Sequence, residues 1–235
     1  MSLLKDDTAL VTGAGRGIGR GMAQALRDEG AQVLGVDLQD ADLAFDLRNQ
    51  KIEDLVGTAI SRLGRVSIFV HCASPRRQES QTALQVTEAE WREMLEVNLN
   101  AGFLLAQALG RHMVEQKIRG RMLFMTSLHA YSPRNLPHYS ASKAGQTMVV
   151  RELARALGPS GIRVNAIAPG AIPGGGFQAP AGMVEKIPLR RFGTPADVAA
   201  MAVAVLSERF GAYVTGTTVA VDGGIALYNW IDPPS

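Results

Sequence analysis

The sequence of 235 residues predicts an α/β fold in which helices cover both faces of a doubly wound, mainly parallel sheet. Short apolar runs alternate with longer amphipathic stretches along the chain, which is typical of parallel strands joined by helices. A glycine-rich turn follows the first apolar run, as in sheets that bind nucleotides at their strand ends. No linker, repeat or low-complexity segment interrupts the pattern. We therefore expect residues 1–235 to form a single domain.

The apolar runs predict the strands in order. They lie near residues 8–12, 31–37, 43–46, 66–72, 121–127, 162–168 and 217–221. We expect helices between most of these strands. Only a short segment separates Asp37 from Asp46, however, so the chain should cross that edge of the sheet as a loop.

Three signals predict where helices begin and end. Thr87 is followed three residues later by Glu90, the spacing of a capping box at a helix start. Gly158, which precedes a proline, should end the helix before it. Thr194, which also precedes a proline, should begin the last long helix.

The glycine-rich turn covers residues 12–19, between the first strand and a helix that should continue through Leu26. Glycines let the backbone turn tightly and approach a pyrophosphate, whose charge then meets the N–H groups at the helix start. An ordinary surface turn is the alternative, but the strand before and the helix after favour a Rossmann-like dinucleotide site. The predicted contact residues are Gly13, Gly15, Arg16, Gly17, Ile18 and Gly19.

A second motif carries the chemistry. Tyr139 and Lys143 are four positions apart in a stretch expected to be helical, so both side chains should leave one helix face. A neighbouring ammonium stabilises a phenolate and so brings the pKa of a tyrosine, near 10 when free, toward neutral pH. Ser127 places a hydroxyl at the tip of the strand just before this helix. We predict that the three side chains converge on one carbonyl or alcohol group.

These motifs resemble those of the short-chain dehydrogenase/reductase family in its common, compact form, and the resemblance covers nearly the whole chain. It includes Asn98 within residues 97–102, and the segments 163–170 and 221–224. It implies a nicotinamide-dependent oxidoreductase in which Ser127, Tyr139 and Lys143 perform the chemistry and Asn98 supports a proton relay. Further cofactor contacts are expected from Asp37, Asp46, Ala73, Tyr139, Lys143, Pro169, Gly170 and Ile172.

Two signals bear on the choice between NAD and NADP. Asp37, at the end of the second strand, is placed to accept hydrogen bonds from the adenosine ribose of NAD, and Asp46 should lie near the adenine. Arg16 could instead hold the 2′-phosphate of NADP. The window from Asp37 to Asp46 holds four aspartates and no lysine or arginine. We therefore expect NAD to be the cofactor, with NADP less favoured.

The chain departs from the family pattern in several places. His71 and Ser74 stand where relatives carry asparagine and glycine after the fourth strand, and we expect His71 to make structural hydrogen bonds. Gly174 replaces a threonine that contacts the nicotinamide. The surrounding residues 171–187 should form a short substrate lid. The usual serine-to-tyrosine spacing falls on Thr126, which is the alternative to Ser127.

Substrate identity is not determined by these patterns. The leading hypothesis is oxidation of a secondary alcohol or reduction of a ketone, with a sugar, polyol, cyclic diol or acyl group as substrate. The alternatives are an epimerase or dehydratase that retains its cofactor and a catalytically silent nucleotide sensor. Arg76 and Arg77 could meet an acidic substrate, although paired arginines on a loop are more often solvated surface.

Composition excludes several other classes. A net charge of +2 gives no reason to expect nucleic acid or an anionic membrane as partner, and no apolar run is long enough for a membrane span. The lone Cys72 and the absence of a signal peptide favour the cytoplasm. His129 and His138 lack metal-ligand spacing, so no metal is expected. The apolar tail at 225–231 favours a homotetramer, with a tail folded over its own subunit as the alternative.

Overall fold

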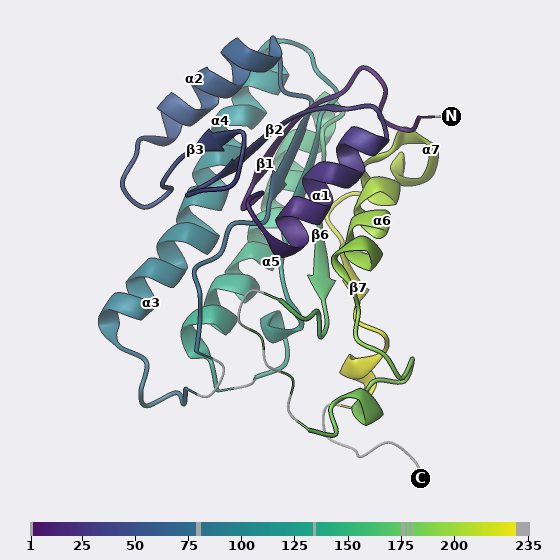
Figure 1. Ribbon diagram of the computed structural model, residues 1–235. Coiled ribbons are helices and arrows are strands. Elements are labelled where there is room, and N and C mark those ends of the chain that lie inside the picture. Colours follow the sequence, from purple (N-terminus) through teal and green to yellow (C-terminus); the bar gives the residue numbers. More distant parts are fainter. Residues whose placement is uncertain are drawn as a thin grey trace.

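The computed structural model describes residues 2–78, 81–133, 135–174, 177, 179 and 181–228. Within this part of the chain, seven strands form one parallel sheet in the order β3-β2-β1-β4-β5-β6-β7 (Figure 1). The strands are β1 (Thr8–Thr12), β2 (Gln32–Asp37), β3 (Leu43–Ala44), β4 (Ile68–His71), β5 (Arg121–Met125), β6 (Arg163–Pro169) and β7 (Thr218–Val221). The predicted doubly wound, parallel sheet is confirmed.

The strand order creates a crevice at the centre of the sheet. The chain runs outward from β1 through β2 to β3, returns to place β4 on the other side of β1, and continues outward to β7. A ligand binds such a sheet outside the carboxyl ends of its strands, where the order reverses. In this sheet the reversal lies between β1 and β4.

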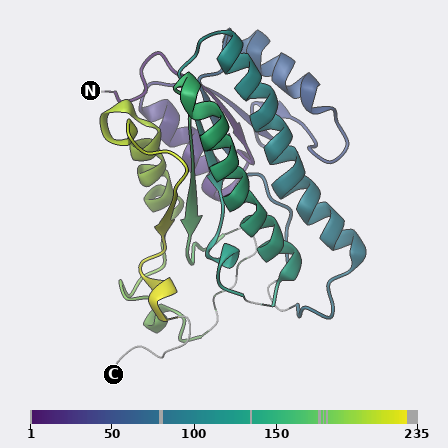
Figure 2. The same ribbon diagram turned by 180° about the vertical axis from the view of Figure 1, so that it is seen from behind.

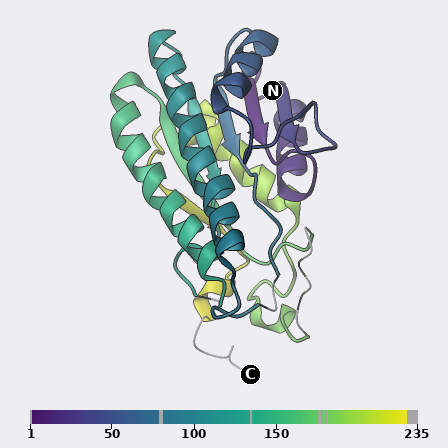
Figure 3. The ribbon, with the colours of Figure 1, turned by 90° about the vertical axis from the view of Figure 1, so that its left-hand side faces the viewer.

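Helices cover both faces of the sheet. Helices α1 (Gly17–Asp28) and α6 (Pro195–Leu206) pack together on one face (Figure 3). The other face is covered by α2 (Ile52–Leu63), α4 (Ala101–Glu115) and α5 (Pro137–Leu157), and the view from behind shows α5 beside α4 (Figure 2). Two shorter helices are α3 (Glu88–Leu95) and α7 (Glu208–Gly211).

The hydrophobic core is divided by the sheet into two layers. In β1, Leu10 packs into the layer under α2, α4 and α5, whereas Ala9 and Val11 pack into the layer under α1 and α6. Successive residues of a strand point to opposite faces, so a strand covered on both sides is apolar throughout. This explains why the apolar runs of the sequence are continuous rather than alternating.

The predicted helix boundaries are confirmed. Thr87 and Glu90 form a complete capping box at the start of α3, and Thr194 forms another at the start of α6. Helix α5 ends at Leu157, and Gly158 is its C-cap.

Five strands are shorter than predicted: β2 and β7 by one residue, β3 and β5 by two, and β4, predicted at 66–72, by three. The edge crossing is a loop, as expected. The strand predicted at 43–46 ends at Ala44, although Phe45 N still donates to Asp37 O. The chain leaves the sheet there and forms a turn at residues 47–49. The strand predicted at 121–127 ends at Met125, although Thr126 N still donates to Ile167 O.

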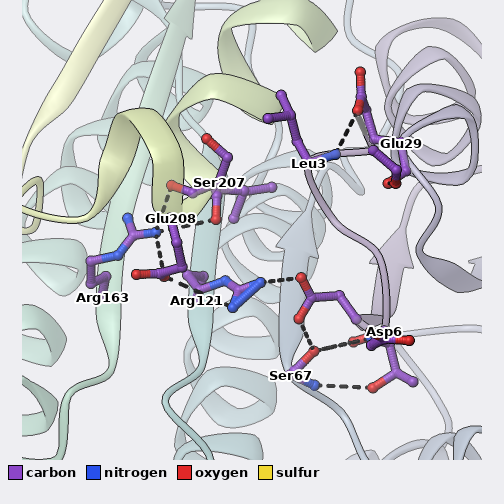
Figure 4. Close-up of polar contacts among 12 residues, drawn as sticks. Leu3, Asp6, Glu29, Ser67, Arg121, Arg163, Ser207 and Glu208 are labelled. Carbon is purple, nitrogen blue, oxygen red and sulfur yellow. Dashed lines mark hydrogen bonds and ion pairs between the residues drawn. The ribbon is translucent and has the colours of Figure 1, made fainter.

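A polar network joins the amino ends of four strands, β1, β4, β5 and β6, opposite the ligand edge (Figure 4). Arg163 donates to Val205 O at 2.8 Å and to Glu208 Oε1 at 3.2 Å. Arg121, its partner in the register of β5 and β6, pairs with Asp7. Because buried charges are costly unless paired, these contacts allow two arginines to begin adjacent strands.

His71 is fully buried at the end of the central strand β4. Its Nδ1 lies 2.9 Å from Thr12 Oγ1, and its Nε2 lies 3.2 Å from both Val97 O and Asn98 O. The carbonyl contacts require Nε2 to carry the proton, so Nδ1 accepts from the Thr12 hydroxyl. The expected structural role of His71 is confirmed by these bonds. Burial lowers the pKa of His71 to about 3.

The low pKa of His71 predicts a specific loss of stability in acid. Below about pH 6.5 the unfolded chain protonates this histidine and the folded protein does not, so stability falls as pH falls toward 3. Between pH 6.5 and 4.5 the wild type should lose about 2–3 kcal/mol more than His71→Asn. Urea unfolding at several pH values measures how the free energy of unfolding changes with pH in both proteins. The same pH dependence in both would contradict a neutral, buried His71.

Candidate active site

One cavity of about 510 Å³ opens at the carboxyl ends of the central strands. Strand β6 points toward this edge in Figure 1. The cavity brings together nearly all of the predicted site residues. Those that line it are Gly13, Arg16, Gly17, Ile18, Gly19, Asp37, Asp46, Ala73, Ser127, Tyr139, Lys143, Pro169, Gly170 and Ile172. Gly15 and Asn98 do not line it, and they act on it through neighbours.

The glycine-rich turn is shaped by close backbone approach. Gly13 has φ +72°, and a Cβ there would lie 2.6 Å from Ala73 N in the neighbouring strand end. A Cβ on Gly19 would lie 2.0 Å from Gly13 O, so the turn can close onto α1 only with glycine. Arg16, the N-cap of α1, makes no side-chain cap bond. The first amides of α1 are therefore left for an anion at the helix N-terminus.

Asp37 ties the turn to β2. Its Oδ2 accepts from Gly15 N at 2.9 Å, and its Oδ1 accepts from Leu38 N at 2.7 Å. A carboxylate offers about four acceptor positions, so two remain for hydroxyl donors in the cavity. Gly15 is needed because a Cβ there would meet Gln39 O at 2.4 Å. The residues at this end thus fit the adenosine ribose and pyrophosphate of a dinucleotide.

Sequence reasoning missed two charged residues at this end. Arg48 pairs with Asp46 and with Glu93, each at 2.8 Å, and both Arg48 and Glu93 line the cavity. The hydrogen bonds from Arg48 hold the pKa of Asp46 at about 2. The position of Arg48, only two residues after Asp46, could have indicated that these two side chains form an ion pair. The apolar lining residues Val36, Leu38, Phe45, Leu47 and Val97 were also missed.

The expected cluster of negative charge is therefore only partly present. Asp42 pairs with Arg27 at 2.6 Å, and Asp46 pairs with Arg48. Both arginines lie outside residues 37–46, and the fold brings them into contact with these aspartates. Asp37 keeps its contacts with backbone amides.

Tyr139 and Lys143 leave the same face of α5, as their spacing predicts. The Lys143 ammonium donates to Met125 O at 2.7 Å and lies 5.5 Å from the centroid of the Tyr139 ring. Burial lowers the pKa of Lys143 to about 7, and the nearby guanidinium of Arg77 acts in the same direction. Met125 ends β5, so this bond connects the helix to the tip of the central sheet.

The two candidate hydroxyls at the end of β5 have different partners. Thr126 Oγ1 donates to Ile167 O at 2.9 Å, which commits its proton to the neighbouring strand. Ser127 Oγ accepts from His129 N at 3.2 Å and keeps its own proton for another acceptor. This arrangement favours Ser127 over Thr126 as the hydroxyl that contacts a substrate.

Asn98 lies behind the cavity in a π-helical turn, Glu96–Asn100, that joins α3 to α4. Its Nδ2 donates to Ser142 Oγ at 2.9 Å, and its backbone carbonyl accepts from Gln146 Nε2 at 2.6 Å. Within the described part of the chain, Asn98 Oδ1 is buried without a hydrogen-bond partner. Single π-turns of this kind often occur at functional sites.

Two of the departures from the expected family pattern, Ser74 and Gly174, also belong to the cavity lining. Phe177 lines the cavity too, and Gly174 forms an isolated bridge with Phe177. Within the predicted lid, residues 175, 176, 178 and 180 lie outside the described part of the chain. Arg77 stacks on the Tyr139 ring, with its guanidinium carbon 4.1 Å from the centroid.

Two kinds of feature are absent from the described part of the chain. No group of three or more His, Cys, Asp or Glu side chains is placed to hold a metal ion. No described helix is long and apolar enough to cross a membrane.

Comparison with known proteins agrees with this geometry. A family model described as enoyl-(acyl carrier protein) reductase matches residues 13–226. Glucose 1-dehydrogenase 2 of Bacillus subtilis is 32% identical, and the match covers 96% of each chain. The solved structure of a candidate short-chain alcohol dehydrogenase from Sinorhizobium meliloti is 34% identical with a TM-score of 0.86, covering 95% of this chain and 98% of that one.

A further solved structure contains a nucleotide. It is a candidate NAD(P)-dependent gluconate 5-dehydrogenase from Beutenbergia cavernae with NADP bound at low occupancy. It is 29% identical with a TM-score of 0.84, covering 95% of this chain and 98% of that one. The chain belongs to the short-chain dehydrogenase/reductase family. It is a nicotinamide-dependent oxidoreductase that acts on CH–OH groups.

The tight contacts of Gly15 predict that this position tolerates no side chain. In Gly15→Ala the new methyl group would meet Gln39 O at 2.4 Å and Asp37 Oδ2 at 2.9 Å, displacing the carboxylate from the cavity. Affinity for the reduced dinucleotide, measured by its fluorescence, should fall at least about tenfold.

Gly57→Ala is the matched control. Gly57 lies in α2, and a Cβ there meets nothing within 4 Å. This substitution should leave nucleotide affinity unchanged and stabilise the fold by about 0.5–1 kcal/mol. Wild-type affinity in Gly15→Ala would show that the turn does not hold Asp37 in place for the nucleotide.

Proposed function

We propose that the protein transfers a hydride between NAD and a secondary alcohol or ketone, with Tyr139 exchanging the substrate proton. The observation that supports this most is the convergence of Ser127, Tyr139 and Lys143 on the cavity that also holds the glycine-rich turn. When bound, the nicotinamide supplies the hydride acceptor or donor. The names of relatives that act on glucose and gluconate favour a sugar or polyol over the epimerase, dehydratase or sensor alternatives.

Each side chain has a distinct proposed role. Tyr139 as phenolate takes the hydroxyl proton during oxidation and returns it during reduction. Ser127 donates its free proton to the substrate oxygen, where negative charge develops. Lys143, when charged, favours negative charge on the Tyr139 oxygen, and it is proposed to hold the nicotinamide ribose. Its pKa of about 7 lets it release and regain a proton near neutral pH.

Asn98 completes the proposed relay. Its Oδ1 is a buried acceptor behind the catalytic helix, and its Nδ2 is held by Ser142 one turn before Gln146. We propose that Oδ1 accepts a hydrogen bond from the water that links Lys143 to solvent. Bonds from His71 and Gln146 to the Asn98 carbonyl would keep this turn in position.

NAD is the proposed cofactor because of the carboxylate at the end of β2. Asp37 lines the cavity beside the turn, where it can accept from ribose hydroxyls and repel a 2′-phosphate. Asp46 is proposed to lie near the adenine. Arg16 also lines the cavity and is the proposed phosphate ligand if NADP proves to be preferred.

Three further proposals concern the lid, the cellular location and the assembly of the protein. We propose that residues 171–187 act as a lid, supported by the position of Ile172 and Met183 on the cavity wall. We propose a cytoplasmic location, supported by the single, unpaired Cys72. We also propose a homotetramer, supported by exposed apolar side chains on the outer faces of α4 and α5, which are Phe103, Leu104, Val114 and Met148.

The C-terminal tail does not by itself support the tetramer. Ile225 is buried against Leu128, Ala168, Ala171 and Ile187 of its own chain, whereas Leu227 is exposed. The rest of the tail, residues 229–231, lies outside the described residues. Light scattering distinguishes the tetramer from a monomer.

The role of Tyr139 predicts the effect of removing one oxygen. Tyr139→Phe should lower turnover more than tenfold while nucleotide affinity stays within a few fold, because the phenol exchanges the proton but does not carry the dinucleotide. Steady-state kinetics on a confirmed substrate measures the loss. Tyr213→Phe, at a fully exposed position, is the control and should not change the rate. A residual rate above about a tenth, a loss under about 1.4 kcal/mol, would rule out Tyr139 as the base.

The role of Asp37 predicts cofactor preference. The wild type should have a kcat/KM for NAD at least about tenfold above that for NADP, because one carboxylate must repel the phosphate without much help from the paired Asp42 and Asp46. Asp37→Ala should weaken the binding of NAD and narrow the ratio of kcat/KM for NAD to that for NADP.

A conservative variant separates charge from loop support. Asp37→Asn removes the charge but keeps one acceptor oxygen for the Gly15 amide. It should therefore narrow the ratio of kcat/KM for NAD to that for NADP, with a smaller loss of NAD affinity than in Asp37→Ala. Higher kcat/KM for NADP in the wild type would overturn the assignment.

A further inference from the structure

An apolar surface lines part of the cavity near the catalytic helix. The short 3-10 helix Leu128–Ala130 follows Ser127 directly and packs against α5, which carries Tyr139. Its first residue belongs to a hydrophobic cluster that is built from several segments of the chain. Five members of this cluster also line the cavity, and we call them the apolar wall: Leu128, Ala171, Phe177, Met183 and Ile225.

The turns that carry the apolar wall are held together after β6 and β7. A Cβ on Gly170 would lie 2.6 Å from the Cα atom of Asp222, so the two strand ends approach closely. Asp222 Oδ2 also accepts from Ala226 N at 3.0 Å, which fixes the turn at the end of β7. Ala171 and Ile225, one residue beside these anchors, are therefore held in position without a ligand.

The five residues of the apolar wall differ in the surface that they offer. Leu128, Ala171 and Ile225 are buried, with exposures of 4%, 8% and 6%. Phe177 and Met183 are half-buried, so their accessible surface is the part that a ligand in the cavity would cover. A packed floor with two partly exposed apolar side chains is typical of a subsite that exists before its ligand binds.

The polar side chains near Tyr139 have contacts of their own. The Arg77 guanidinium carbon lies 4.1 Å from the centroid of the Tyr139 ring, and the edge of the His129 ring contacts the same ring at a centroid distance of 5.1 Å. The hydroxyls of Ser127 and Tyr139 serve one substrate oxygen, which is the reacting one. The apolar wall itself offers no polar side-chain atom to any other oxygen of a substrate.

We propose that the substrate is a secondary alcohol, or the corresponding ketone, whose reacting carbon carries an alkyl or cycloalkyl group that packs on the apolar wall. This inference rests on the proposed function, because it places the reacting carbon at Tyr139, and it selects against a sugar or polyol. Hydroxyls of a sugar would give up hydrogen bonds to water at the apolar wall and gain none in return. An apolar group is instead stabilised in proportion to the area that it buries.

The apolar group is unchanged by the reaction. In oxidation, the carbinol C–H bond breaks and its hydride goes to the nicotinamide, while the hydroxyl proton goes to Tyr139. The product is the ketone with the same alkyl or cycloalkyl group. The competing explanation is that the apolar wall only packs residues 171–187 against the sheet. That explanation predicts equal binding of apolar and polar ligands of the same shape.

A dead-end ligand pair tests the proposal without turnover. 1-Methylcyclohexanol and 4-methyloxan-4-ol have the same shape, and the second carries an ether oxygen in place of the ring CH₂ opposite the carbinol carbon. Both are tertiary alcohols with no hydrogen on that carbon, so neither can be oxidised. Calorimetry on wild-type protein saturated with its oxidised dinucleotide should show 1-methylcyclohexanol binding at least about fivefold more tightly.

Two variants of the apolar wall and one control complete the binding test. Met183→Gln and Phe177→Gln each place an amide on the half-buried part of the wall, and each should lower the preference to about twofold or less. Met201→Gln makes the same change as the first variant on α6, where Met201 is 38% exposed and does not line the cavity, and it should keep the full preference. Equal binding of both ligands by the wild type, or an unchanged preference in either wall variant, would overturn the proposal.

A kinetic panel separates this inference from the proposed function. Along the series 2-butanol, 2-pentanol and 2-hexanol, kcat/KM should rise by up to about fourfold for each added CH₂. Tyr139→Phe should stop turnover of every member while still binding 1-methylcyclohexanol. Fast turnover of sugars or polyols with no rise along the series would reject the apolar subsite and leave the oxidoreductase function intact. Tight binding of 1-methylcyclohexanol with no turnover of any alcohol or ketone would instead reject the proposed function and keep the apolar ligand site.

Discussion

The structure depends on one constraint, which is that all strands of a central parallel sheet end at the same edge. β1 delivers the glycine-rich turn, β2 delivers Asp37, and β5 delivers Ser127 to that edge. The amino ends are joined separately by Arg121, Arg163 and their partners. Because binding groups and structural charges occupy opposite edges, the ligand edge can remain open without weakening the sheet.

A second layer of polar contacts supports the site from behind. The imidazole of His71 connects β1, through Thr12, to the π-turn at Asn98. It can make both connections because a neutral imidazole both donates and accepts. It brings a titratable group into the core, and burial keeps that group neutral by lowering the pKa of His71. The proposed chemistry at Tyr139 would thus rely on hydrogen bonds of His71 and Asn98, neither of which lines the cavity.

Charge is unevenly distributed among the described residues that line the cavity. The nucleotide end pairs its carboxylates with Arg48 and leaves Asp37 to its backbone donors. The end near Tyr139 is lined by cations, and one of them stacks on the ring.

The sequence alone determined the fold class and the members of the site, because strand ends, helix caps and the Tyr139–Lys143 spacing are local patterns. Short continuous apolar runs that alternate with amphipathic stretches are typical of parallel strands buried on both faces, and parallel strands have their carboxyl ends at one edge. The tertiary structure alone decided the electrostatics. Arg27 and Arg48 pair with aspartates of residues 37–46 although both arginines lie outside that segment. Arg77, which follows β4, stacks on Tyr139 of α5. Such contacts depend on distances through space, which residue spacing does not encode.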